Sequence, residues 1–258
     1  FVKYVAAGLY EDITVAFGTQ WTEETFEIVA GEQASWEVGP YVDQGFSNGS
    51  NGFPGFQPQD AGTFDRRNYA FYVDTEAEFT EQLLGAVALR YEDYQNFGNK
   101  TNYKLSLQYR IDDDWALRGS ASTGFRVPSV GQSNVSNVRT ALNDDGVLED
   151  IALLPATNPI ARLKGSKDLK PEESKSVAVG LVYSGYDFFI TADAYNIHVT
   201  NRIGQSTEIP VTADEIAELK AQGIRGIDLL SKITYFTNDF DTTTRGLDLV
   251  ANYSTFCT

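Results

Sequence analysis

Apolar and polar residues alternate along long stretches of this sequence, and that pattern restricts the chain to β-structure. In KLSLQYR, Leu105, Leu107 and Tyr109 share one face while the polar residues share the other. The same split recurs in LLGAVALRYE, WALRGSASTGFR and SVAVGLVYS. A period of two is that of a strand, whose successive side chains point to opposite faces. The pattern predicts about ten strands, at residues 1–9, 13–30, 67–79, 82–95, 101–111, 115–126, 174–184, 186–200, 232–240 and 243–254.

The lengths of the strands and connections indicate the type of sheet. Several strands approach the roughly nine to eleven residues that cross a bilayer at a tilt. Short turns (YED, TE, DDD, SGY, DTT) alternate with four outer connections. Three of these are long loops near 31–66, 127–173 and 201–231, and the fourth, at 96–100, is short. Successive hairpins point in opposite directions, so the turns fall on one rim and the long loops on the other. This asymmetry is typical of outer-membrane barrels. We therefore predict an all-β fold in which residues 1–258 are part of one antiparallel up-and-down transmembrane β-barrel domain.

One outer loop contains a helix signal. In VTADEIAELKAQGI, Thr212 is the expected N-cap, Glu215 completes a capping box and Gly223 ends the helix. The segment is short and mostly polar. It predicts a surface helix near 213–222 on the outer rim.

Composition excludes several classes of function. The 20 Lys and Arg residues against 36 Asp and Glu give a net charge of −16, which would repel nucleic acid. A single cysteine, Cys257, allows no internal disulfide and no cysteine-based zinc cluster. The longest nearly apolar run, Leu83 to Leu89, is too short for a membrane-spanning helix. Because Phe1 opens directly into a predicted strand and the chain has no Met, we expect an internal fragment.

Five blocks of sequence resemble the barrel of TonB-dependent outer-membrane receptors. They are LRYEDY, FGNKTNYKLSLQYR, STGFRVPSVGQ, DLKPEESKSVAVGLVY and YFTNDFDTTTRGLDLVANYS. The resemblance implies a barrel of about 22 strands around an N-terminal plug, of which this chain shows only barrel strands and no plug or TonB box.

The resemblance also implies the function. The outer loops of such a receptor capture a small nutrient, and an inner-membrane TonB complex, acting through the plug region, drives its import. A ferric siderophore is the expected ligand, with carbohydrate or cobalamin as alternatives. The implied location is the outer membrane of a Gram-negative bacterium, in contact with its lipid. No enzymatic activity, cofactor or metal site is expected.

Candidate ligand-binding residues lie in the predicted outer loops. Loop 31–66 is rich in aromatic residues among Gly, Asn and Gln, which suit a sugar or an aromatic chelator or simply pack the loop onto itself. Arg126, at the end of a strand, either meets an anionic ligand or a plug residue, or pairs with a neighbouring carboxylate on the lumen wall. The candidates are Trp36, Tyr41, Phe53, Phe56, Arg126, Gln132, Asn134 and Arg139.

The sequence disfavours two further sites, a calcium site and a protease site. The acidic residues around NDDG, at 143–146, with Glu149 and Asp150, lack the alternating spacing of a helix-loop-helix calcium site. His198 and Asp193 would suit an outer-membrane barrel protease, but five residues of separation put them on opposite faces of a regular strand.

A soluble secreted β-rich carbohydrate-binding module is the alternative from a different class. It would pack its apolar faces against each other between two sheets. The barrel instead predicts one outward apolar belt with Tyr109 and Tyr183 near its edge. The belt residues are Leu105, Leu107, Leu117, Val177, Val179 and Leu181.

Overall fold

The structure, a computed structural model, describes residues 1–37, 39–41, 49, 55–142, 146, 148–221 and 230–254. In chain order its elements are β1 (Val2–Val5), β2 (Ile13–Ile28), α1 (Gln33–Trp36), β3 (Gly62–Thr80), β4 (Leu83–Tyr94), β5 (Gly98–Arg110), β6 (Trp115–Arg126), α2 (Val130–Asn134), β7 (Asn137–Leu142), β8 (Leu148–Leu154), α3 (Pro159–Leu163), β9 (Glu172–Gly185), β10 (Phe188–Gln205), β11 (Ile209–Pro210), α4 (Ala213–Ala221) and β12 (Leu230–Tyr253). Within these ranges, no helix is long and apolar enough to cross a bilayer.

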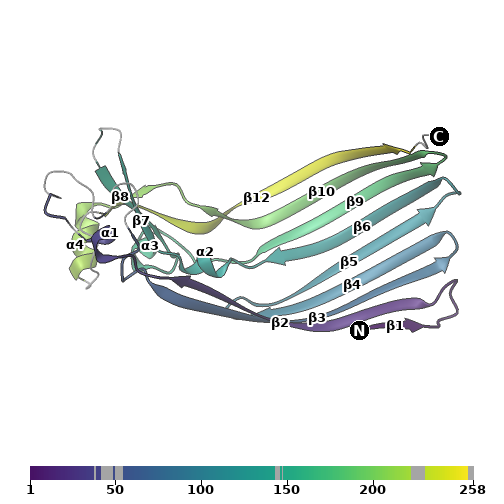
Figure 1. The fold of residues 1–258 in the computed structure, drawn as a ribbon, viewed down its shortest axis with the longest axis horizontal. Helices are drawn as coiled ribbons and strands as arrows, with labels where there is room; N and C mark the ends of the chain where they lie inside the picture. Colours follow the sequence, from purple (N-terminus) through teal and green to yellow (C-terminus); the bar gives the residue numbers. More distant parts are fainter. Residues whose placement is uncertain are drawn as a thin grey trace.

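The strands form one twelve-stranded sheet that is open in the described part of the chain. Its main part, in the order β1-β2-β3-β4-β5-β6-β9-β10-β12, is antiparallel throughout. Apart from the short connection between β4 and β5, the tight turns lie at one end of the sheet, whereas the helices, β7 and β8 gather at the other, the outer rim (Figure 1). The predicted all-β, partial-barrel fold and its sorted connections are confirmed.

The predicted outward belt is present. Its members are strongly exposed despite being apolar, with 46% of Leu105 and 53% of Val179 accessible. Register aligns Leu107 with Gly119 and Val179, and Tyr109 with Leu117 and Leu181, so these side chains share one face. Apolar side chains that cover the outside of a sheet are stable when lipid surrounds them. The packed double sheet of the soluble alternative would have buried them.

Aromatic residues border this belt at both ends. Tyr91 and Tyr103 lie towards the outer rim, and Trp115 and Tyr183 pack at the turn end with ring centroids 4.8 Å apart. Aromatic girdles mark the two interfaces of a bilayer. The girdles place the outer rim outside the apolar layer.

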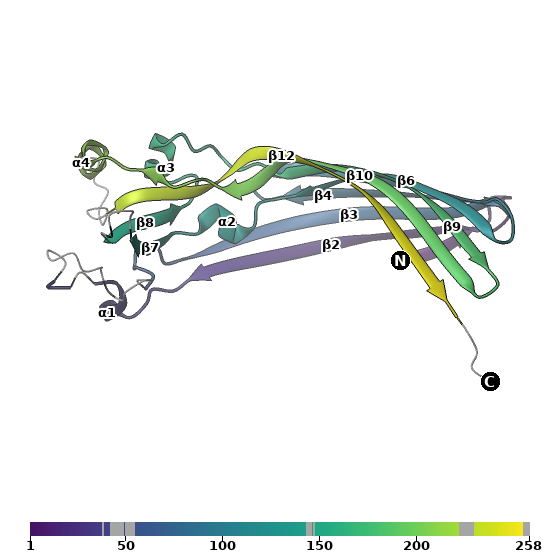
Figure 2. The same cartoon turned by 90° about the horizontal axis from the view of Figure 1, so that it is seen from above.

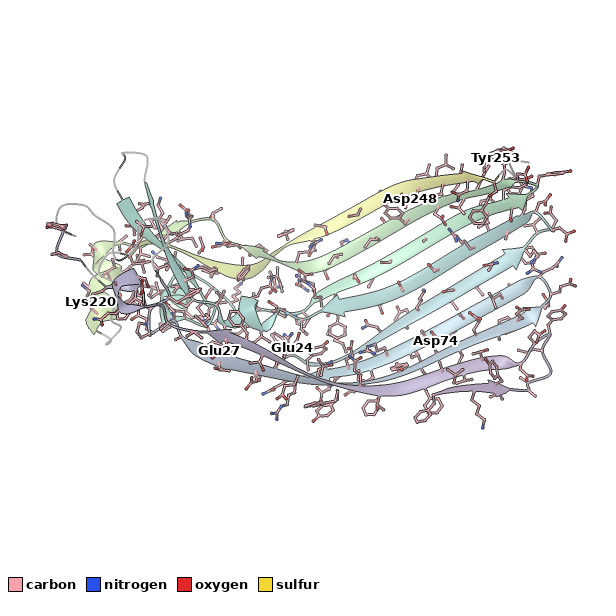
Figure 3. All side chains as sticks on the ribbon, in the orientation of Figure 1. Glu24, Glu27, Asp74, Lys220, Asp248 and Tyr253 are labelled. Atoms are coloured by element: carbon pink, nitrogen blue, oxygen red, sulfur yellow. The ribbon has the colours of Figure 1, made fainter. Side chains whose placement is uncertain are left out.

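The opposite face of the sheet is polar. It carries Asp74 on β3 and Asp248 on β12, which Figure 3 labels. Arg118 of β6 pairs with Asp193 of β10 across this face, with Nε donating to Oδ1 at 2.8 Å. This inner face lines a depression of about 440 Å³.

Several predicted boundaries were wrong. Segments 232–240 and 243–254 are one strand, β12, and DTT forms no turn, because β10 pairs with β12 through this region. A bulge at Asn201, whose φ is +54°, absorbs the irregularity, and Asp241 accepts the Asn201 N–H at 2.9 Å. β3 begins at Gly62, inside the predicted loop 31–66, and the predicted first strand shrinks to Val2–Val5.

Candidate functional site at the outer rim

Residues 127–142, 148–171 and 206–221, which flank β9 and β10 in the sequence, fold together at the outer rim (Figure 2). β8 pairs in parallel with the first part of β12, β7 pairs with β8, and β11 pairs with β12 from the other side. This parallel pairing departs from the predicted antiparallel sheet. We call β7, β8, β11, α3, α4 and the start of β12 the outer platform.

The outer platform has its own hydrophobic core. Ile233 is fully buried, with Ala152 as its register partner on β8 and Ile209 as its partner on β11. The buried core residues are Ala152, Leu154, Ile160, Ala161, Val211, Leu219, Leu230, Ile233 and Tyr235. Because burial of apolar side chains drives folding, these loops form a defined surface at the mouth of the barrel.

Charges connect the strands of the platform. Arg139 on β7 donates to Glu208 at 2.5 Å, and Lys232 on β12 lies 3.5 Å from the other oxygen of Glu208 and pairs with Glu149 on β8. Glu149 and Glu208 raise the pKa of Lys232. The candidate Arg139 is therefore part of an ion-pair network within the platform.

The predicted helix is present as α4, and its N-terminal capping box is formed. Glu215 accepts the Thr212 N–H at 2.7 Å, and the Thr212 hydroxyl accepts the Glu215 N–H at 3.3 Å. Lys164, after α3, also pairs with Glu215. The hydrogen bond from Lys164 and those from Thr212 lower the pKa of Glu215 from 4.5 to about 2. Gly223, the predicted end of the helix, lies outside the described residues.

A second structure at the mouth is α2, which follows β6 and contacts β2 and β3. Ser129 and Gln132 form a reciprocal capping box, and Asn134 donates to the Val130 carbonyl at 2.9 Å. The candidates Gln132 and Asn134 thus stabilise the helix on which they lie.

Arg66 of β3 anchors α2 to the barrel wall. Its guanidinium donates to the Pro128 carbonyl and, through Nε at 2.9 Å, to Glu24 of β2. The rings of Tyr94 and Phe97 lie 5.5 and 6.0 Å from the Arg66 guanidinium carbon. The Arg66 side chain is only 8% exposed, so it binds a loop to the wall from a buried position.

Arg126 pairs with a carboxylate at the mouth, one of its two predicted roles. Its Nε and Nη2 donate to Glu172 of β9 at 3.0 and 2.8 Å. Glu172 is buried and also accepts the Ile203 N–H of β10 at 2.8 Å. The three strands β6, β9 and β10 are therefore joined where the platform begins.

The aromatic candidates lie in a separate loop, between β2 and β3. Trp36 on α1 donates its indole N–H to the Gly31 carbonyl at 3.1 Å, and the Gly31 N–H donates to the Phe56 carbonyl at 2.9 Å. These bonds bring Trp36 and Phe56 into the neck of the loop. Tyr41 is 60% exposed. Phe53 lies outside the described residues.

Sequence reasoning missed Arg66, Glu24 and Glu172. A signal for the first two exists, because the sequence contains Glu23-Glu24 and Arg66-Arg67, and the register pairs Glu24 with Arg66 and Glu23 with Arg67. Because a long connection separates β2 from β3, the sequence alone does not show which residues of the two strands pair.

The arrangement for a barrel protease is not formed. Asp193 is held by Arg118 on the inner face, whereas His198 lies beside Lys175 on the outward face, with Nδ1 3.0 Å from the Thr243 hydroxyl. No group of three or more His, Cys, Asp or Glu side chains suited to a metal occurs within the described ranges.

An outward apolar belt between two aromatic girdles, a polar inner face and a folded outer rim define a barrel of the outer-membrane type. The family described as TonB dependent receptor-like, beta-barrel matches residues 5–256. The chain belongs to this family.

Known proteins agree with this assignment. The vitamin B12 transporter BtuB of Vibrio cholerae is 23% identical over 163 residues, which are 62% of this chain and 22% of the transporter. The siderophore receptor PirA of Pseudomonas aeruginosa has a TM-score of 0.64 and 13% identity, over 96% of this chain and 37% of the receptor. A mutant of the ferric enterobactin receptor PfeA of the same species, in complex with enterobactin, has a TM-score of 0.64 and 14% identity, over 96% of this chain and 32% of that receptor. The chain thus spans less than two fifths of the length of each relative.

Proposed function

We propose that this chain is the part of an outer-membrane receptor that captures a scarce nutrient, most simply a ferric siderophore, for TonB-energised import. The receptor would lie in the outer membrane of a Gram-negative bacterium, in contact with lipid, and would engage the TonB complex through a plug region outside this chain. The observation that carries the proposal is the outer platform, a folded surface at the mouth of a barrel.

The platform and α2 suit ligand capture because both are joined to the strands that form the mouth. Arg66 connects α2 to β2 and β3, and Arg126 with Glu172 joins β6, β9 and β10. Binding sites are commonly loops held by a rigid scaffold. We assign Arg126, Gln132, Asn134 and Arg139 to holding this scaffold, because each bonds within it.

The aromatic loop supplies the contacts to the ligand in this proposal. Trp36, Tyr41, Phe53 and Phe56 offer ring faces, and flat aromatic surfaces suit the catecholate groups of a chelator. The loop is pinned at its neck by the Gly31 and Phe56 bond. Tyr41, exposed beyond that neck, is the residue whose truncation tests the contact most directly.

Cobalamin is the second candidate ligand. Its support is the sequence similarity to vitamin B12 transporters over 62% of this chain. The support for a siderophore is the fold similarity to siderophore receptors over 96% of the chain.

Binding to the complete receptor that carries this chain distinguishes the two. Quenching of tryptophan fluorescence would be titrated with ferric enterobactin and with cyanocobalamin, and uptake would be compared in cells with and without TonB. Saturable binding of ferric enterobactin with TonB-dependent iron uptake is expected. The same result with cyanocobalamin assigns the second candidate, and binding of neither ligand refutes both.

A variant pair tests the aromatic loop. Tyr41→Ala should weaken ligand binding about tenfold, the effect of losing one well-packed aromatic contact. Tyr69→Ala is the matched control, because Tyr69 is similarly exposed, at 54% against 60%, but lies on β3. Equal affinities for the two variants would remove Tyr41 from the site.

A further inference from the structure

The aromatic loop, which connects β2 to β3 through residues 29–61, ends in a turn that Asp60 closes. The Asp60 N–H donates to the Gln57 carbonyl at 2.9 Å, and the Gln57 N–H donates back to Asp60 Oδ2 at 3.2 Å. Pro58 occupies the second position of this turn, where its fixed φ is favourable. Asp60 is only 8% exposed, so its carboxylate depends on hydrogen bonds within the protein.

The other carboxylate oxygen of Asp60 binds a different connection. Oδ1 accepts the hydroxyl hydrogen of Ser136, which lies 76 residues further along the chain, between α2 and β7. Ser136 directly precedes β7, a strand of the outer platform. One buried carboxylate therefore closes the turn of the aromatic loop and binds the junction between α2 and the outer platform.

The helix α2 is attached to the β2 and β3 side along its whole length. Arg66 of β3 binds the backbone before α2, and Asp60 binds Ser136 after it. Between these two points Gly131 packs against the ring of Phe26 on β2, since a Cβ atom at Gly131 would be 3.4 Å from that ring. A short helix held at both ends and in the middle is a rigid element, and such elements carry coupling between distant segments.

We propose that Asp60 is a positioning residue that couples the aromatic loop to the outer platform, with α2 as the rigid link. Loosening the junction at Ser136 loosens the aromatic loop, and contacts that stabilise the aromatic loop stabilise α2, because a coupling free energy acts equally in both directions. The coupling is a property of these side chains. Its use in nutrient capture rests on the proposed function.

Hydrogen exchange of the complete receptor without nutrient tests the coupling. Ser136→Ala changes only the α2 side of the contact. We expect exchange in segment 31–37, at the neck of the aromatic loop, to accelerate at least about tenfold, the effect of losing one hydrogen bond to a charged group. Ser133→Ala is the matched control, because the hydroxyl of Ser133 on α2 is buried without a hydrogen-bond partner in the described part of the chain. It should leave exchange in segment 31–37 at the parent rate.

Asp60→Ala provides the reverse measurement. It should accelerate exchange in segment 130–135, although Asp60 lies outside α2. Asp60→Asn should restore the parent rates, because the amide oxygen can accept the Gln57 N–H while the amide nitrogen donates to the Ser136 hydroxyl. If each alanine variant accelerates exchange only in its own segment, the contact is local and the proposal is overturned. Ser136→Ala decides the question alone if Asp60→Ala does not fold.

Ligand affinities of the same samples separate this inference from the proposed function. Ferric enterobactin and cyanocobalamin serve as the two probes. Ser136→Ala should weaken binding of the probe that the parent receptor binds, and should add little to the loss in Tyr41→Ala, because both substitutions act through the aromatic loop. An unchanged affinity, or a loss that adds fully to that of Tyr41→Ala, overturns the role in capture. If neither probe binds the parent, the proposed function fails while the exchange rates still decide the coupling.

Discussion

Arg66→Ala should detach α2 from the wall of the barrel. The substitution removes the bonds to Glu24 and to the Pro128 carbonyl and the packing on Tyr94 and Phe97. Breaking a buried ion pair costs roughly 3–5 kcal/mol. The side chain of Glu24 is 49% exposed, so water solvates the carboxylate left behind. We therefore expect the low end of that range, about 3 kcal/mol, which corresponds to about a hundredfold change in the opening equilibrium of α2.

Hydrogen exchange of the amides in segment 130–135, measured on the complete receptor, tests this prediction. Arg67→Ala is the control, because Arg67 makes the adjacent pair with Glu23 at 2.8 Å but is 59% exposed. Such a solvent-exposed pair contributes little to stability, because water and salt screen it. Exchange in α2 should accelerate about a hundredfold in Arg66→Ala and little in Arg67→Ala. Similar rates in the two variants would refute the role of Arg66 as an anchor.

Three other predictions concern the platform and the belt. Ile233→Ala, at a fully buried position, should destabilise the platform by about 2–5 kcal/mol, and limited proteolysis of the platform would show it as faster cleavage than in Ile233→Val. The pKa of Glu215 is lowered from 4.5 to about 2, so its ionised carboxylate stabilises the contact between α3 and α4. This contribution is fully present above pH 4.5 and is lost as pH falls towards 2. Exchange in α4 should therefore depend on pH in that range once corrected for intrinsic rates, and a Glu215→Gln variant should show no such dependence. Val179→Lys places a charge in lipid and should lower the free energy of unfolding from vesicles, measured by urea titration, by about 2–4 kcal/mol. Val179→Leu should be as stable as the parent, and equal stability of the two variants would place Val179 outside the bilayer.

The wall of the barrel could be predicted because its pattern is local. In KLSLQYR the alternation alone assigns each side chain to a face, and the observed register places Leu105 and Leu107 on the apolar face with Val177 and Val179. The capping box at Thr212 and Glu215 is equally local, since its two partners are three residues apart.

The prediction failed where contacts between residues distant in the sequence determine the structure. The Asp241 to Thr243 segment has the composition of a turn, but its pairing with β10 and the bond from the Asn201 N–H keep it extended. Two of the candidate residues pair with distant carboxylates. Arg126 binds Glu172, 46 residues away in the sequence, and Arg139 binds Glu208, 69 residues away.

The sequence by itself determined the strands, the faces they present and the rim that carries the long loops, because side-chain alternation and hairpin direction are properties of short segments. Only the tertiary structure decided that two of those loops share one hydrophobic core, that Arg66 holds α2 against β2 and β3, and that β5 and β6 separate beyond Lys104 and Ser122. These features depend on contacts between residues far apart in the chain. Their free energy comes from desolvation and charge pairing that exist only once the sheet has curved and brought the distant segments together.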